Sequence, residues 1–395
     1  MNLINVHTHI FNLENAPDDF VGGFVPKSLR KLAVKIIHNK LARKLLIAAL
    51  KRLGPGSQRL ASFISVGLFK RQEDIFEDLR SNYSDNSRFV VLTLNMDHMS
   101  VAPPKNFFTH QIRDVQLLRQ KYPNRCLPFY SCDPRSGTGA ELFANVKEHV
   151  VHRGNGNDGA FIGLKLYPAL GFYPFDRDLE LVYEYAANHN LPIMTHCTRS
   201  GAYYLGRISG SMTRPDSFCG YPMSYKELEG WDMINFLTLR AGRRTKNKDF
   251  CDNFLHPLNY YGVLKHFEKK GKKLKICFAH LGGVPEIKKS EKVSWFHMIL
   301  FLMRTFPGQV YADVSYTLYD KDIFDELVGV MKDARYKDQL LFGTDYFMTL
   351  KEKSEASLVG DFTTYLSEVN AMEEFRKMAG ENAKRYLSSG VFECK

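Results

Sequence analysis

The sequence predicts an α/β protein folded as a closed (β/α)8 barrel of the TIM type, with two long insertions at one rim. Apolar runs of strand length recur eight times along its 395 residues, and stretches with helical periodicity lie between most of them. Strands that alternate with helices indicate parallel βαβ units, and eight such units suggest closure into a barrel. Five of the runs also end in histidine, lysine or aspartate, which is typical of strand ends that form a site.

The predicted strands and helices alternate in chain order. Strands are predicted at 3–6, 89–95, 126–131, 160–166, 191–196, 274–279, 309–313 and 339–343. Helices are predicted at 109–121, 139–151, 177–189, 258–270, 294–305, 321–333, 355–368 and 372–387. Because a typical barrel of this kind needs only about 250 residues, we expect the whole chain, 1–395, to be one domain enlarged by insertions.

Two long segments interrupt this alternation. Residues 11–88 separate the first two strands, and residues 198–254 follow the fifth. Both segments start at the C-terminal rim of the predicted barrel, where loop insertions form substrate pockets. The first is basic and predicted to be helical. The second is rich in Tyr, Gly, Ser and Arg, and we expect an aromatic-lined lid or pocket wall.

The formal net charge of +11 comes from one part of the chain. Twelve Lys or Arg and no Asp or Glu lie between Val21 and Gln72, so the remainder is close to neutral. A nucleic-acid-binding protein would need a broader basic face. Within this segment, five apolar residues fall on one helical face: Val34, Ile37, Leu41, Leu45 and Ala48. We expect a helix packed over the barrel mouth, rather than one that binds an anionic membrane or nucleic acid.

Composition and cysteine usage restrict the class of protein further. With 44% hydrophobic and 25% charged residues, the chain is an ordinary globular one. No apolar run approaches the roughly 20 residues that span a bilayer, and a site beginning at residue 7 leaves no room for a secretory signal peptide. Seven dispersed cysteines without a CxxC pair predict reduced thiols in the cytoplasm. We expect a small-molecule substrate and no integral membrane or nucleic-acid partner; a homo-oligomer stays open.

His7 and His9 stand two residues apart on the first predicted strand. Side chains at this spacing point to the same face of a strand. Inward positions of such barrels are usually branched aliphatic residues, so two imidazoles there are unusual. The pair is therefore predicted to bind a metal ion from one side.

Three more strand ends carry candidate ligands. His196 closes the fifth strand and is predicted to bind the metal. His280 closes the sixth, and is either a ligand or a base that contacts the metal-bound water. Asp345 follows the eighth; a helix cap is the ordinary role of such an aspartate. Beside cations at a barrel mouth, however, it would stay ionised, bind the metal and accept a proton.

Lys165 lies inside an otherwise apolar strand. Because lysines are almost never buried without a partner, we expect it to be carboxylated and bridge two metals, or to remain cationic and hold a substrate carboxylate. An outward position between helices is the structural alternative. Arg199 is a candidate for pairing with a substrate carboxylate, and Tyr167 and Tyr203 are weaker substrate-binding candidates.

Taken in order, His7/His9, Lys165, His196, His280 and Asp345 resemble the amidohydrolase superfamily of metal-dependent barrel hydrolases, in particular its amidohydrolase-related branch. The resemblance covers roughly residues 1–385. It implies one or two divalent metal ions, with Zn²⁺ expected. Lys165-Leu166-Tyr167-Pro168 also resembles the bridging-lysine strand of dihydroorotase, which implies two ions. Branch members that resemble aminocarboxymuconate-semialdehyde decarboxylase use one ion, and their counterpart of His280 acts on the bound water.

The predicted function is metal-dependent hydrolysis of a C–N or C–O bond in a small acidic carbonyl compound. A metal ion lowers the pKa of its water from about 15.7 towards 7, and Asp345 or His280 would then take the proton. The alternative is metal-dependent, non-oxidative decarboxylation of an unsaturated or aromatic acid. The least favoured reading is a non-catalytic scaffold whose basic helix binds a membrane or nucleic acid. Substrate, number of ions and oligomeric state stay open.

Overall fold

Eight parallel strands form the centre of the molecule, in the order β1 to β8. The computed structural model describes residues 2–18, 20, 35–36, 39–99, 103–151, 159–201, 203–231, 238–289 and 293–394. The strands are β1 (Ile4–Thr8), β2 (Arg88–Leu92), β3 (Cys126–Cys132), β4 (Gly163–Leu166), β5 (Pro192–Thr195), β6 (Lys275–Phe278), β7 (Val310–Asp313) and β8 (Leu340–Leu341). All eight predicted strands are confirmed.

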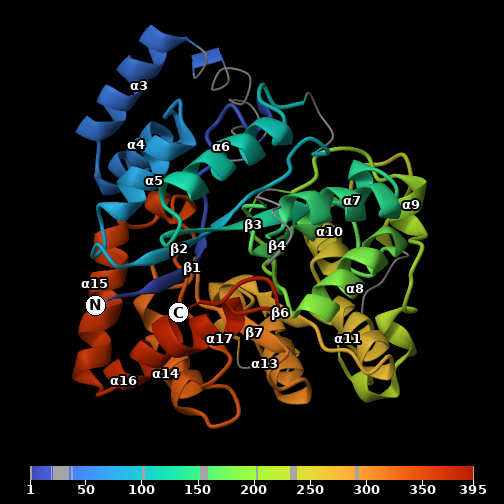
Figure 1. Ribbon diagram of the computed structural model, residues 1–395. Coiled ribbons are helices and arrows are strands. Elements are labelled where there is room, and N and C mark those ends of the chain that lie inside the picture. The colour runs from blue at the N-terminus through green and yellow to red at the C-terminus, as the bar shows by residue number, and fades with distance from the viewer. Residues whose placement is uncertain are drawn as a thin grey trace.

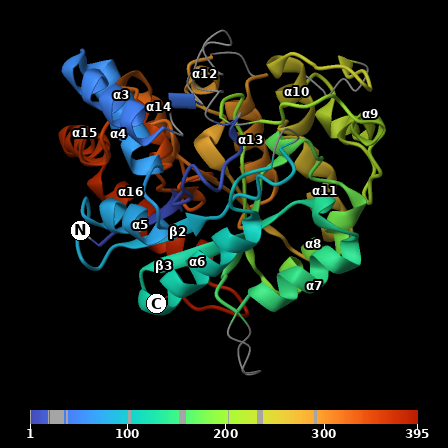
Figure 2. The same ribbon diagram turned by 90° about the horizontal axis from the view of Figure 1, so that it is seen from above.

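The barrel closes between its first and last strands. The Val6 amide donates to the Phe342 carbonyl, and the Asp345 amide donates to the His7 carbonyl, both at 2.9 Å. Thr8 and Tyr346 form a parallel bridge at the same seam. The predicted (β/α)8 barrel is therefore confirmed, and helices surround the strands when the molecule is seen from above (Figure 2).

The predicted helices between the strands are also present (Figure 1). They are α6 (Phe108–Lys121), α7 (Gly139–His149), α8 (Glu180–His189), α11 (Asn259–Lys269), α13 (Trp295–Thr305), α14 (Phe324–Lys332) and α15 (Glu355–Glu368). The segment predicted as one helix over 372–387 is α16 (Met372–Arg376) and α17 (Asn382–Leu387), joined by a π-helical turn. Helices were thus predicted correctly from their apolar periodicity, with small differences at their ends.

Apolar side chains form two buried clusters. The larger one lies between the strands and the surrounding helices. The smaller one fills the barrel interior with side chains such as Val90, Leu127 and Met194. Tyr386 of α17 belongs to this inner cluster and packs on Tyr311 with ring centroids 5.2 Å apart. Apolar side chains and α17 thus fill the interior of the barrel and its N-terminal end. The polar residues lie at the other end, where the strands have their C-termini.

The insertion between β1 and β2 contains α3 (Lys40–Arg52), α4 (Pro55–Gly67) and α5 (Gln72–Arg80). Helix α3 packs on α4, and α4 packs on a 3-10 turn, η10 (Met348–Lys351), that follows β8. Of the predicted apolar face, Val34 and Ile37 lie outside the described residues. Leu41 and Leu45 are 69% and 63% exposed, so α3 turns this part of the face to solvent.

The insertion after β5 contains the short helix α9 (Gly210–Thr213), 3-10 turns and α10 (Asn247–Phe254). Its aromatic side chains pack on one another within the insertion and on α13. The rings of Tyr203 and Tyr204 lie near Phe250 of α10, with centroids 6.4 and 6.1 Å away, and Trp231 packs on Phe301. The segment is aromatic as predicted, and Tyr203, Tyr204 and Phe250 line a pocket beside α10.

Among the helices that the structure describes, none has the length and apolar character needed to cross a membrane.

Candidate metal centre

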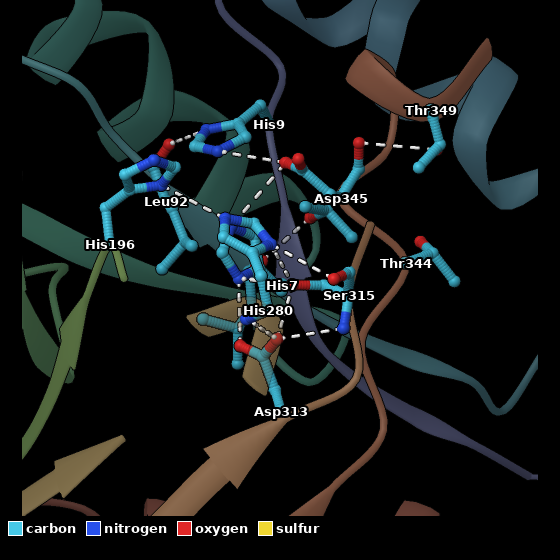
Figure 3. A network of polar contacts seen from close by, with 12 residues as sticks. His7, His9, Leu92, His196, His280, Asp313, Ser315, Thr344, Asp345 and Thr349 are labelled. Atoms are coloured by element: carbon cyan, nitrogen blue, oxygen red, sulfur yellow. Dashed lines mark hydrogen bonds and ion pairs between the residues drawn. The ribbon is translucent and has the colours of Figure 1, made fainter. Parts of the chain in front are cut away.

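The C-terminal ends of the strands bring the predicted histidines and aspartate together (Figure 3). His7 and His9 come from β1, His196 follows β5, His280 follows β6 and Asp345 follows β8. All five side chains are buried, as is Lys165 on β4. Residues up to 338 positions apart thus meet at one point, because parallel strands end at the same rim.

Three of these side chains direct ligand atoms at one another. Asp345 Oδ1 lies 3.3 Å from His9 Nε2 and 3.6 Å from His7 Nε2. The three atoms are close enough to share one metal ion. Within the described part of the chain, His7 Nε2 and Asp345 Oδ1 are buried without a hydrogen-bond partner. Leaving such atoms unsatisfied costs about 1–3 kcal/mol each, and a divalent cation would satisfy both.

Hydrogen bonds on the far side of each ring set the tautomers of His7 and His9. His7 Nδ1 donates to Asp313 Oδ2 at 2.9 Å, and His9 Nδ1 donates to the Leu92 carbonyl at 3.0 Å. With the proton held on Nδ1, each Nε2 presents its lone pair to the space beside Asp345. This arrangement suits metal coordination.

His196 and His280 face each other with nitrogens that lack protons. His196 Nε2 donates to the Ser200 carbonyl at 3.0 Å, and His280 Nδ1 donates to the Ser315 carbonyl at 3.1 Å. The remaining nitrogens, His196 Nδ1 and His280 Nε2, are 3.0 Å apart. Two lone pairs at this distance repel unless a proton or a cation lies against them. A proton shared between the two nitrogens, or a cation nearby, would relieve this repulsion.

Burial keeps the imidazoles neutral. It lowers the pKa of His7, His9 and His280 well below the usual value, and lowers the pKa of His196 to about 3. The charge of Lys165 acts in the same direction. Burial raises the pKa of Asp345 well above its usual value, which disfavours the carboxylate in the metal-free protein. A bound cation would reverse this effect by stabilising the ionised form.

Lys165 points into the site and not outward between helices. Its charge interacts with Asp345 and Asp313, and its Nζ is buried without a hydrogen-bond partner among the described residues. Burial lowers the pKa of this amine to about 8, which increases the fraction of neutral amine at neutral pH. A neutral amine can be carboxylated and a charged one can hold an anion, so both functional readings of Lys165 remain.

Two of the site residues occupy unusual backbone conformations. His280 has a φ of 67° and Asp345 a φ of 61°. Side-chain-bearing residues held in this region cost on the order of 1–3 kcal/mol each and occur often at functional sites. Next to Asp345, a Cβ added to Gly343 would lie 2.8 Å from His7 Cβ. Glycine is therefore required there for β8 to approach β1.

A small cavity of about 60 Å³ opens above these residues. Its floor carries His9, His196, His280 and Asp345. The remaining lining residues are Phe11, Phe20, Leu94, Tyr167, Thr198, Ser200, Gly201, Tyr316, Met348 and Lys351. Both insertions reach the cavity, the first through Phe11 and Phe20 and the second through the residues directly after His196.

The three predicted substrate-binding residues lie in different places. Tyr167 lines the cavity, with its ring centroid 4.5 Å from that of His196. Arg199 is outside the cavity lining and pairs with Asp252 at 2.7 Å and with Glu286. Tyr203 accepts a hydrogen bond from Asn247 at 2.5 Å and lines a separate pocket beside α10.

Several residues of the site were not predicted. Asp313 and Ser315 hold the far sides of His7 and His280. Asp313 could have been predicted from the sequence, because it is the last residue of the seventh apolar run, and the other site residues also lie at the ends of such runs. The lining residues Phe11, Phe20, Tyr316 and Lys351 lie outside the periodic apolar runs, and nothing in the sequence placed them at the rim.

Known proteins share this architecture. A 5-carboxyvanillate decarboxylase of Novosphingobium aromaticivorans, solved with manganese and 4-hydroxy-3-methoxy-5-nitrobenzoic acid, is 13% identical; 98% of this chain and 96% of that chain are covered, with a TM-score of 0.52. A probable 2-pyrone-4,6-dicarboxylic acid hydrolase of Acinetobacter baumannii, solved with citric acid, is 12% identical. The match covers 98% of this chain and 99% of that chain, with a TM-score of 0.48. At these identities the likeness concerns the fold. No curated protein matches the chain.

The sequence itself matches a family model. The model described as amidohydrolase matches residues 111–388, which is more than half of the chain. The match begins after β2 and extends to the end of α17, so it includes the strand ends that carry Lys165, His196, His280 and Asp345. Structures similar to this chain include both hydrolases and decarboxylases, and neither reaction is favoured by them. The chain belongs to the amidohydrolase family.

Proposed function

We propose that this protein is a metal-dependent hydrolase that cleaves a C–N or C–O bond of a small acidic carbonyl compound. The observation that carries the proposal is the convergence of His7 Nε2, His9 Nε2 and Asp345 Oδ1 on one buried point. His196 would complete the ligand set through Nδ1. Neutral imidazoles with a carboxylate are ligands that suit zinc, so Zn²⁺ is the proposed ion.

The metal supplies Lewis acidity when bound: it polarises a carbonyl oxygen and lowers the pKa of a water to near 7. The protein positions the reactants and moves the proton. Asp345 lies on the cavity floor, where it can accept the proton of the attacking water and return it to the leaving group. His280 lines the same floor with an unprotonated Nε2 and is the alternative base.

A decarboxylase is the second candidate, and the cavity wall favours it. Phe11, Phe20, Tyr167 and Tyr316 give the cavity an aromatic lining suited to a flat unsaturated acid. In this reaction Asp345 and His280 would exchange a proton with the substrate carbon. Lys165 discriminates between the two reactions: carboxylation with two bound ions favours hydrolysis, whereas one ion and a free amine favour decarboxylation.

Metal analysis of the purified protein and of His7→Ala tests the metal assignment. We expect His7→Ala to bind zinc at least about tenfold more weakly, because one ligand is lost. His110→Ala is the matched control, since His110 is exposed on α6. Full metal content in His7→Ala would contradict the proposal. Assaying the zinc-loaded protein with esters, amides, lactones and aromatic acids then separates hydrolysis from decarboxylation.

We further propose a cytoplasmic location and a single domain over 1–395. All seven cysteines are free thiols in the structure, and six of them are buried. Such an arrangement suits a reducing compartment.

A further inference from the structure

We propose that Lys351 binds an anionic group of the substrate, remote from the group that reacts. The substrate class would be acids with a flat apolar body that carry a carboxylate at one end and the reacting carbonyl or carboxyl group at the other. This inference rests on the proposed metal-dependent function and adds the residue that selects the substrate.

Lys351 lies at the cavity rim on η10, the 3-10 turn that follows Asp345. It lines the same cavity as His9, His280 and Asp345. Among the described residues that line this cavity, it is the only lysine or arginine. The cavity therefore combines a polar floor, aromatic walls and a lysine at its rim, in addition to Lys165 beside the floor.

The position of Lys351 relative to the floor is fixed by the fold. The Thr349 amide donates to the Asp345 carbonyl at 3.2 Å, which ties η10 to the end of β8. Thr349 and Leu350 are buried, and α4 packs on the turn from outside. The ammonium of Lys351 thus extends from a rigid base, which reduces the entropy lost when a ligand binds.

The ammonium of Lys351 lies beside an aromatic ring and near two carboxylates. Lys351 Nζ lies 5.0 Å from the centroid of the Tyr316 ring, which forms one wall of the cavity. Its charge interacts with the carboxylates of Glu352 and Asp345. Glu352 accepts a hydrogen bond from Tyr316 Oη at 2.9 Å, and Asp345 is a proposed metal ligand. With a divalent cation bound beside Asp345, the positive charge at this end of the cavity increases, and an anionic substrate would balance it.

Arg199 is poorly placed for this role. Its guanidinium is engaged by Asp252 and Glu286 and lies over the Trp295 ring, 4.2 Å from the centroid. Recruiting it to a substrate would break two ion pairs. Lys351 therefore takes the carboxylate-binding role that the sequence suggested for Arg199.

Binding of two matched probes tests the proposal by titration calorimetry of the zinc-loaded protein. Isophthalate carries two carboxylates, whereas 3-carbamoylbenzoate has the same shape with one of them replaced by a neutral amide. We expect the unaltered protein to prefer isophthalate by about tenfold, the range of a charge-assisted hydrogen bond. Lys351→Met should bind both probes with similar affinity, and Lys351→Arg should retain the preference.

Lys321→Met serves as control, because Lys321 pairs with Asp361 at the surface outside the cavity. It should keep the full preference for isophthalate. Three results would overturn the proposal: no preference in the unaltered protein, an unchanged preference in Lys351→Met, or an equal loss of both probes in Lys351→Met with unchanged thermal stability. Failure of the metal assignment is seen separately, as full zinc content in His7→Ala.

Discussion

His7 and Asp313 form a fully buried hydrogen bond of 2.9 Å that joins the first strand to the seventh. The other carboxylate oxygen of Asp313 accepts the backbone amides of His280 at 3.0 Å and Ser315 at 2.9 Å. One aspartate thus orients a ligand on β1 and the loop after β6. Asp313 does not contact the proposed metal itself. It influences metal binding by fixing which nitrogen of His7 carries the proton.

Replacing Asp313 with Asn is expected to lower metal affinity by roughly 10- to 100-fold. The amide oxygen can keep the bonds to the backbone, but the amide nitrogen would then face His7 Nδ1. His7 would have to move its proton to Nε2, where it blocks the metal. Competition with a chelator measures the affinity. Asp322→Asn is the control, because Asp322 is 80% exposed and pairs with Lys288; equal affinities for the two variants would refute this role.

Replacing Asp345 with Asn should stabilise the metal-free protein while abolishing metal binding. Burial raises the pKa of Asp345, so ionising it in the folded state is unfavourable at neutral pH. Asn removes this ionisation, and it tolerates the left-handed backbone at this position. We expect a midpoint of thermal unfolding a few degrees higher at pH 7 without metal. A lower midpoint would show that Asp345 has a different electrostatic role.

The unfolding free energy of the metal-free protein should fall as the pH drops below about 6.5. Burial lowers the pKa of the site histidines, for His196 to about 3, so between these values the unfolded chain binds protons that the folded protein excludes. This histidine contribution to stability is complete above 6.5 and decreases towards pH 3, by up to about 1.4 kcal/mol per pH unit for each histidine, while the raised pKa of Asp345 acts in the opposite direction. Urea unfolding from pH 7.5 to 4.5 measures the slope. His196→Asn should reduce it by about one proton; an identical slope would exclude His196 as a contributor.

The barrel was predictable because its strands and helices each leave a local pattern. Short apolar runs and helical periodicity depend on residues that are neighbours in sequence, and the order of eight such units implies the closure seen between Val6 and Phe342. The candidate ligands were predictable for the same reason. A polar residue that ends an apolar strand must lie at the rim, whichever loop follows it.

The cavity walls and the substrate contacts were not predictable in this way. Phe11, Phe20 and Lys351 reach the rim through the packing of an insertion and a 3-10 turn, neither of which has a period. Arg199 follows His196 by only three residues, yet the chain turns it away from the cavity towards Trp295. Proximity in sequence beyond a strand end therefore carries little information about where a side chain points.

Replacing Arg199 with Met should affect stability more than substrate binding. Glu286 is 4% exposed and is held by Arg199, by Lys289 at 2.7 Å and by the Trp295 amide at 2.9 Å. Without Arg199 this nearly buried carboxylate keeps two partners, so we expect a loss of roughly 1–3 kcal/mol in the unfolding free energy. The affinity for isophthalate should change less than about threefold, since the cation at the cavity is Lys351. A loss of affinity at unchanged stability would instead return the carboxylate-binding role to Arg199.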